Sequence, residues 1–213
     1  MKVIAINGSP RKKWNTATLL EHALKGAESA GAETKLVHLY DLDYKGCISC
    51  FACKLKGGKS FGKCAVNDDL APLLEEIRTV DALILGSPIY FGDVTGEMRS
   101  FMERLFFQFP IYEPDAAVRQ PKKVRTAWVY TMNVTEELAR QMGYDRMFRD
   151  NAALLERFFG SCESLMCYDT LQFDDYSKYA ARRFDPVAKR KRHEEAFPED
   201  CKRAYELGAR LVR

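Results

Sequence analysis

The stretch Val3-Ile4-Ala5-Ile6-Asn7-Gly8-Ser9-Pro10-Arg11 decides the fold of this chain. An apolar run enters a Gly-Ser-Pro turn, and Asn15-Thr16 then begin an amphipathic segment, an order typical of strand, loop and helix N-terminus. The N–H groups of a first helical turn lack intrahelical partners and carry partial positive charge, so such a loop favours an anion. Hydroxyl, amide and guanidinium donors in this stretch indicate a phosphate. A turn without a ligand is the alternative.

The spacing of the glycines limits which kind of phosphate site this is. The stretch matches neither GxGxxG nor GxxxxGK[ST], the signatures of dinucleotide-binding folds and of P-loops. The loop is equipped for one terminal phosphate, and no second phosphate-binding signature accompanies it. The sequence therefore favours a mononucleotide over a dinucleotide as the bound group.

Outward from this stretch, strand-like and helix-like segments alternate along the chain. We expect strands at 3–7, 34–40, 82–86, 125–131 and 165–168, and helices at 16–30, 68–79, 96–107, 135–159 and 198–212, with a long loop at 41–66 and irregular structure at 174–196. Strands interleaved with helices predict an α/β fold whose parallel sheet is covered on both faces. We expect one domain over residues 1–213, with 174–213 as a C-terminal extension.

Composition excludes several classes of protein. The chain has 213 residues, 46% of them hydrophobic, and a net charge of +3, which predicts an ordinary globular protein with no polyanionic partner. The basic run 189–192 is interpreted as a solvated face, and we expect no nucleic-acid or membrane binding. The apolar run at 3–6 is too short for a secretory signal, so we expect a cytoplasmic protein. In that reducing compartment the seven cysteines are thiols or metal ligands.

Three of the predicted strands lead into unusual loops. Open parallel sheets bind ligands beyond the carboxyl ends of their strands, so these loops meet at one edge. The second loop, Gly86-Ser87-Pro88-Ile89-Tyr90-Phe91-Gly92-Asp93, offers amides and an aromatic pair to a flat ring, although core packing also explains the aromatics. The third, Thr131-Met132-Asn133, offers polar groups to the edge of such a ring. A phosphate together with a planar heterocycle describes FMN.

The cysteines of the long loop form a second group of interest. Cys47, Cys50 and Cys53 are separated by two residues each, and Cys64 is the nearby fourth thiol, beyond an interval of ten residues with three glycines and four lysines. Thiols at this spacing are able to converge on one centre, and the residues leave three alternatives open: a [4Fe–4S] cluster, zinc, or free or redox-active thiols. The remaining cysteines, at 162, 167 and 201, are interpreted as packing residues.

At these motifs the sequence resembles the flavodoxin-like NAD(P)H-dependent FMN reductases, and within them the iron–sulfur flavoprotein branch, over residues 1–135. The resemblance implies a doubly wound five-stranded sheet of order 2-1-3-4-5, FMN, NAD(P)H as co-substrate, and a homodimer or homotetramer. By that resemblance the FMN phosphate is held by Ser9, Arg11, Asn15, Thr16 and Ala17, and the isoalloxazine lies against Pro88, Ile89, Tyr90, Phe91 and Gly92. The position of the third loop adds Met132 and Asn133 at the polar edge of the ring. Trp14, at a position where a small residue is common, departs from the family pattern, as does the long interval before Cys64.

Three functions follow from this interpretation. The first is an FMN-dependent NAD(P)H oxidoreductase that reduces a small acceptor such as a quinone, a nitro or azo compound, or a flavin. The second is an electron carrier that takes electrons from a ferredoxin-like donor through the cysteine loop. The third is a thiol redox or metal sensor on the same scaffold. None requires catalytic acids or bases, since the flavin supplies the reacting centre, and the three histidines are interpreted as structural or surface residues.

Overall fold

A buried apolar strand, β3 (Ala82–Pro88), forms the centre of the sheet in this computed structural model, which describes residues 1–112 and 122–213. β1 (Lys2–Asn7) and β4 (Val124–Thr131) pair with it, and β2 (Glu33–His38) and β5 (Gly160–Cys167) form the edges. The strand order is β2-β1-β3-β4-β5, and every pairing is parallel. The expected order 2-1-3-4-5 is confirmed.

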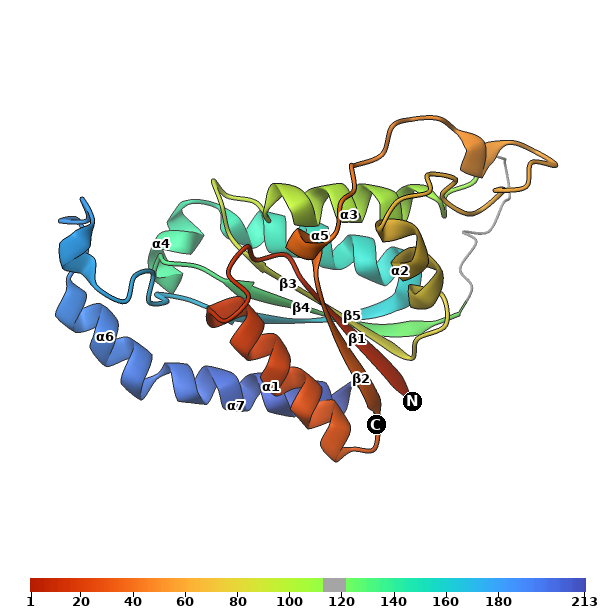
Figure 1. Cartoon of the computed structure of the whole chain (residues 1–213). Coiled ribbons are helices and arrows are strands. Elements are labelled where there is room, and N and C mark those ends of the chain that lie inside the picture. The colour runs from red at the N-terminus through yellow and green to blue at the C-terminus, as the bar shows by residue number, and fades with distance from the viewer. Residues whose placement is uncertain (113–121) are drawn as a thin grey trace.

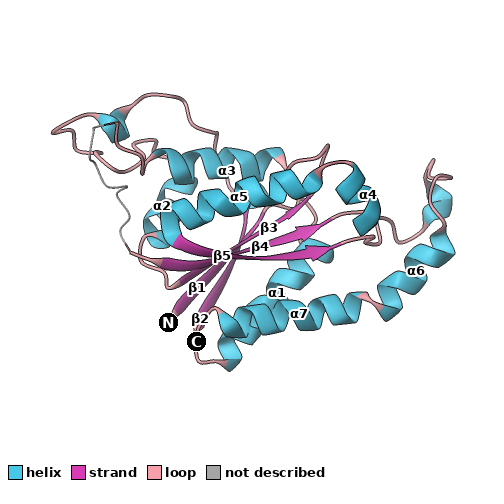
Figure 2. Ribbon diagram, turned by 180° about the vertical axis from the view of Figure 1, so that it is seen from behind, coloured by secondary structure: helices cyan, strands magenta, loops and turns pink. Residues whose placement is uncertain are grey.

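Helices cover both faces of the sheet (Figures 1 and 2). α1 (Asn15–Ser29) and α7 (Phe197–Arg210) pack on one face, and α2 (Leu70–Ile77), α3 (Gly96–Phe107) and α5 (Tyr144–Phe159) pack on the other. Alternate residues of each central strand supply the two cores, because successive side chains of a strand point to opposite faces. No helix in the described part of the chain has both the length and the apolarity that crossing a membrane requires.

Two glycines allow α1 and α7 to pack closely. A Cβ at Gly26 would lie 1.9 Å from the carbonyl oxygen of Tyr205, and one at Gly208 would lie 1.7 Å from that of Ala23. Any side chain at either position would clash with the backbone of the opposite helix. The last helix of the chain is thereby fixed against the first, and the segment between β5 and α7 is drawn to the edge of the sheet where α1 begins.

Three sequence predictions about the elements are wrong. The single helix expected at 135–159 is two, α4 (Glu136–Gln141) and α5, because Gly143 adopts a left-handed conformation with φ of 75°. β5 begins at residue 160 and not at 165, since its first half is an exposed edge whose polar residues hide the strand pattern. The segment expected to be irregular contains α6 (Pro186–Glu195), which Asp185 caps by accepting from the N–H groups of Val187 and Ala188.

Candidate functional site

The loops that follow β1, β3 and β4 surround one cavity of about 120 Å³ at the carboxyl edge of the sheet. The residues that line it come from these three loops and from the segment after β5: Ser9, Arg11, Trp14, Asn15, Thr16, Pro88, Ile89, Tyr90, Thr131, Met132, Asn133, Thr170, Leu171 and Gln172. Nine of the twelve cofactor-binding residues named from the sequence are among them. The topological switch point between β1 and β3 lies at this edge, where open parallel sheets bind their ligands.

The beginning of α1 forms the polar end of the cavity. Asn15, Thr16 and Ala17 in the first turn are buried, yet no side chain caps the helix. Uncapped N–H groups at a buried helix start are strong donors without intrahelical partners, and the helix dipole adds positive potential there. Arg11 lies 4.6 Å above the ring of Trp14, and its partial burial lowers the pKa of the guanidinium without removing its charge. The arrangement suits a phosphate.

Side-chain donors at this end are engaged by backbone carbonyls of the segment after β5. Arg11 Nη1 donates to the carbonyl oxygen of Gln172 at 2.7 Å. Trp14 Nε1 and Asn15 Nδ2 both donate to the carbonyl oxygen of Leu171, at 3.1 Å and 2.8 Å. Residues 171 and 172 therefore lie across the first loop, and an anion in the cavity would share or take over these donors.

Hydrogen bonds also join the three loops to one another. Thr16 Oγ1 and Thr131 Oγ1 are 2.8 Å apart, which links the first loop to the third. Ile89 N donates to the carbonyl oxygen of Thr131 at 2.9 Å, which links the second to the third. Thr95 Oγ1 donates to the carbonyl oxygen of Gly8 at 2.7 Å and ties the start of α3 to the first loop. The cavity walls are held in place before any ligand binds.

The loop after β3 divides into a wall and a projecting turn. Pro88, Ile89 and Tyr90 line the cavity, and the side chain of Tyr90 is 44% exposed at its mouth. Phe91 and Gly92 follow in a tight turn with φ of 52° and 84°, closed by paired hydrogen bonds between Tyr90 and Asp93. The Phe91 side chain is fully exposed and does not line the cavity. Ala17, Phe91 and Gly92 are thus the expected site residues that lie near the cavity without lining it.

Asn133, in the loop after β4, is left with a free acceptor. Its Nδ2 donates to Gln172 Oε1 at 2.8 Å, whereas its Oδ1 is buried and has no hydrogen-bond partner among the described residues. A buried polar atom without a partner costs free energy unless a ligand or water satisfies it. The loop after β4 therefore carries one unsatisfied acceptor beside the residues that line the cavity.

The sequence analysis missed three lining residues, Thr170, Leu171 and Gln172. They follow β5, whose last residues were recognised as a strand, so the carboxyl-edge argument that located the other loops applied to them as well. What concealed them was the absence from this stretch of the glycine and proline residues that marked the first two loops. Their role depends on contacts with residues more than a hundred positions away.

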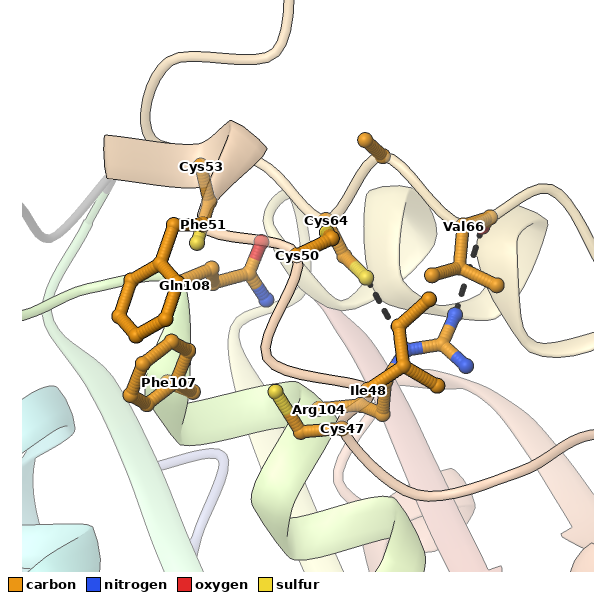
Figure 3. Close-up of a pocket in the computed structure, with 11 residues that line it drawn as sticks. Cys47, Ile48, Cys50, Phe51, Cys53, Cys64, Val66, Arg104, Phe107 and Gln108 are labelled. Carbon is orange, nitrogen blue, oxygen red and sulfur yellow. Dashed lines mark hydrogen bonds between the residues drawn. The ribbon is translucent and has the colours of Figure 1, made fainter. Parts of the chain in front are cut away.

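The four cysteines of the long loop line a second, separate hollow of about 20 Å³ (Figure 3). The loop folds back through a short 3₁₀ turn at Ala52–Lys54, which brings Cys64 to the same hollow as Cys47, Cys50 and Cys53. Burial raises the pKa of the Cys53 thiol. Within residues 1–112 and 122–213 no three His, Cys, Asp or Glu side chains are arranged to hold a metal ion. A cluster would require the thiols to spread around it.

Arg104 in the last turn of α3 and Gln108 directly after it project into this hollow (Figure 3). The Arg104 side chain is 1% exposed; its Nε donates to Cys64 Sγ at 3.0 Å, and its terminal nitrogens bind both oxygens of Asp68 at 2.8 and 3.1 Å. Gln108 is also buried, and its Oε1 has no partner among the described residues.

Comparison with known proteins identifies the family. The model of the family described as NADPH-dependent FMN reductase matches residues 1–133. The chain belongs to this family. An iron-sulfur flavoprotein of Methanocaldococcus jannaschii is 40% identical over 104 residues, 49% of this chain and 51% of that protein. One from Archaeoglobus fulgidus is 41% identical over 104 residues, 49% of this chain and 48% of that protein, so the chain spans about half the length of the relatives it matches.

Solved structures agree with the fold of this FMN reductase family member. An NAD(P)H:quinone oxidoreductase from Methanothermobacter marburgensis superposes with a TM-score of 0.73 at 16% identity, covering 100% of this chain and 98% of that one. An azoreductase from Bacillus anthracis gives a TM-score of 0.68 at 15% identity, covering 99% of each chain. Identities this low establish the shared fold alone.

Proposed function

We propose that the chain binds FMN in the cavity at the carboxyl edge of the sheet and passes electrons from NADH or NADPH to a small acceptor. The observation that carries this proposal is the buried, uncapped start of α1 in a cavity that Pro88, Ile89 and Tyr90 also line. FMN has one phosphate at the end of a chain and a flat ring at the other end. The phosphate suits the free N–H groups of α1, and the ring suits the wall formed by Pro88, Ile89 and Tyr90.

In this proposal the residues take the following parts. The phosphate is bound by Ser9, Arg11, Asn15, Thr16 and Ala17, and the ring by Pro88, Ile89, Tyr90, Phe91, Gly92, Met132 and Asn133. The cavity volume, about 120 Å³, suits the phosphate and part of the ribityl chain. The ring then lies at the mouth along Tyr90, with one face open to a nicotinamide and afterwards to the acceptor.

FMN supplies hydride acceptance and onward electron transfer, so no catalytic acid or base is needed from the chain. The protein residues bind and orient. The α1 dipole and Arg11 stabilise the phosphate charge, Tyr90 and Pro88 give the ring an apolar surface, and Asn133 fixes its polar edge. Quinone, nitro, azo and flavin acceptors all fit this scheme, and quinone and azo reduction agree with the names of the structural neighbours.

The cofactor and the reaction are tested separately. The released cofactor is run beside FMN and FAD standards on a column, where recovery of FAD, or no flavin after reconstitution, contradicts the first half of the proposal. The flavoprotein is then mixed anaerobically with NADH and with NADPH in a stopped-flow instrument. We expect flavin reduction much faster than that of free FMN, and ping-pong kinetics with a quinone. Reduction only by reduced ferredoxin would overturn the enzyme assignment.

One observation favours a second function, that of an iron–sulfur electron carrier. All four loop thiols line one hollow beside a buried arginine, and the relatives quoted above are named iron-sulfur flavoproteins. Four thiolates are the ligand set of a [4Fe–4S] cluster, although the present hollow of about 20 Å³ is too small for one. Iron and sulfide are assayed per chain after anaerobic purification, with about four of each expected. Zinc alone, or no metal with four reactive thiols, would favour the sensor function.

We also propose a homodimer or homotetramer. The exposed Phe91 ring, beside the mouth of the cavity, is an apolar surface that a second copy of the chain would cover. Light scattering after size-exclusion chromatography measures the mass directly. A monomer at micromolar concentration would contradict this expectation.

A further inference from the structure

We propose that His38 is a positioning residue of the cofactor site, which shapes the first loop, residues 8–14 between β1 and α1, through the side chain of Asn7. The inference rests on the proposed function, because the group that this loop would receive is the FMN phosphate. It goes beyond that function by giving a part in the site to β2, which lies outside the residues that line the cavity.

Asn7 and His38 are the last residues of β1 and β2, and they are partners in the parallel register. Their side chains meet, with Asn7 Nδ2 and His38 Nδ1 2.9 Å apart. Asn7 is completely buried, whereas His38 is half-buried on the edge strand. A buried amide needs partners for its nitrogen and its oxygen, and His38 supplies one of them from the neighbouring strand.

The first loop fixes which way the Asn7 amide is turned. Ser9 N lies 3.0 Å from Asn7 Oδ1, and a backbone N–H is a donor, so the oxygen of the amide has to face it. The Asn7 nitrogen, which is a donor, then faces His38. His38 Nδ1 meets it only as an acceptor, which requires the neutral tautomer with its hydrogen on Nε2.

The same amide begins a chain of contacts that ends at Arg11. Asn7 Oδ1 accepts from Ser9 N, and Ser9 Oγ in turn accepts from Arg11 N at 3.2 Å. Side chains that bond the backbone two residues further on fold it into a turn, so these bonds curl the loop from residue 7 to residue 11. Ser9 and Arg11 both line the cavity. The guanidinium offered to a phosphate is therefore carried on backbone that Ser9 and Asn7 hold.

Loss of His38 should affect the Asn7 amide more than the fold. The second contact of Asn7 Nδ2, to the carbonyl oxygen of Ser9, is long at 3.4 Å, so His38 is the stronger partner. Gly8 is held from another side, because its N–H donates to Gly86 and its carbonyl oxygen accepts from Thr95. Those bonds remain without His38, but the Asn7 amide is then free to rotate and release Ser9.

The contact itself is tested without any ligand. The tautomer of His38 is read from the imidazole nitrogen resonances of the 15N-histidine-labelled apoprotein, and its signals are assigned by their absence from His38→Asn. We expect the hydrogen on Nε2 and an unprotonated Nδ1 at neutral pH. A hydrogen on Nδ1, or an even mixture of the two tautomers, overturns the inference.

The effect on the site is tested with two ligands that differ by the phosphate, FMN and riboflavin. Flavin fluorescence on the reconstituted full chain gives both dissociation constants. His38→Leu, which removes the acceptor, should weaken FMN binding about tenfold, the factor that the loss of one buried hydrogen bond gives, and should leave riboflavin binding unchanged. His38→Asn, whose side-chain oxygen replaces Nδ1 as the acceptor, should restore most of the FMN affinity.

His22→Leu is the matched control, because His22 is half-buried on α1 and does not line the cavity. Its FMN affinity should equal that of the wild type. If His38→Leu fails to fold, His38→Val carries the test, since valine favours strands. If riboflavin binds too weakly to titrate, the 31P resonance of bound FMN replaces it and should shift in the His38 variant.

Two results with well-folded His38→Leu overturn the inference. One is an unchanged FMN affinity, and the other is an equal loss for FMN and riboflavin, or an unshifted 31P resonance, which indicates a merely structural role. A wild-type protein that binds no FMN refutes the proposed function instead, and the tautomer measurement then still decides whether His38 accepts from Asn7.

Discussion

Asn15 Nδ2 donates to the backbone carbonyl oxygen of Leu171 at 2.8 Å, joining the first turn of α1 to the segment after β5. Trp14 shares the same acceptor, and Arg11 binds the next carbonyl along. In the proposed complex a phosphate accepts hydrogen bonds from this set of donors. Occupation of the site is therefore coupled to the position of residues 171 and 172, which also carry the contact to Asn133.

Arg11→Ala and Asn15→Ala should each weaken FMN binding by about 1–3 kcal/mol, the range for losing a charge-assisted or buried hydrogen bond. Flavin titration of the apoproteins measures the loss. Lys13→Ala, an exposed change in the same loop, should leave the affinity as it is. Unaltered binding in both Arg11→Ala and Asn15→Ala would show that the phosphate binds elsewhere.

Tyr90→Ala should lower turnover more than it lowers stability, because Tyr90 is 44% exposed at the mouth of the cavity and contributes little to the core. Steady-state rates with a quinone and the melting temperature are compared for the same preparation. Phe91→Ala is the comparison variant, because Phe91 lies in the exposed turn next to the cavity wall that Tyr90 forms. We expect a smaller loss of turnover in Phe91→Ala. A larger loss of turnover in Phe91→Ala would place the ring against the projecting turn.

Asp68 should make the protein sensitive to acid. Its pKa is lowered, chiefly by the hydrogen bonds from Arg104, so its contribution to stability is fully present above the ordinary aspartate pKa of 3.8 and is lost as the pH falls through the lowered value. We expect urea unfolding of Asp68→Asn to show a weaker loss of stability between pH 5 and pH 3 than the wild type. Equal pH profiles for the two proteins would refute a stabilising role of this pair.

Gly143→Ala should destabilise the protein by about 1 kcal/mol, because Gly143 separates α4 from α5 in a left-handed conformation that costs an L-residue free energy. Gly96→Ala is the paired control: no atom lies within 4 Å of a Cβ at that position, and its φ is not left-handed. Alanine at the start of α3 should be neutral or stabilising. Thermal unfolding measures the stability of both variants. Unchanged stability in Gly143→Ala would contradict the expected cost of the left-handed conformation.

Local pattern was sufficient for most of the elements. The buried run at β3, the amphipathic periodicity of α1 and α3, and the polar loops at the carboxyl ends are each properties of neighbouring residues, and nine lining residues named from the sequence agree with the structure. The strand order expected from the family resemblance agrees with it as well. The pattern failed at β5, α6 and the break at Gly143. An edge strand lacks the two-sided apolar signal, and a left-handed glycine inside a helical pattern gives no sign of its φ.

The sequence by itself determined the order of strands and loops along the chain, the set of polar donors at residues 9–17 and the grouping of four cysteines, because each depends on residues close together in the chain. Only the tertiary structure decided that Leu171 and Gln172 line the cavity and that Lys189 binds the backbone of Asn133. It also decided that Phe91 is exposed outside the cavity lining and that Arg104 meets Cys64. These contacts exist because packing of α7 on α1 and closure of the long loop bring distant segments together. Hydrophobic periodicity and residue spacing do not reveal these contacts, because each contact forms between residues that are far apart in the sequence.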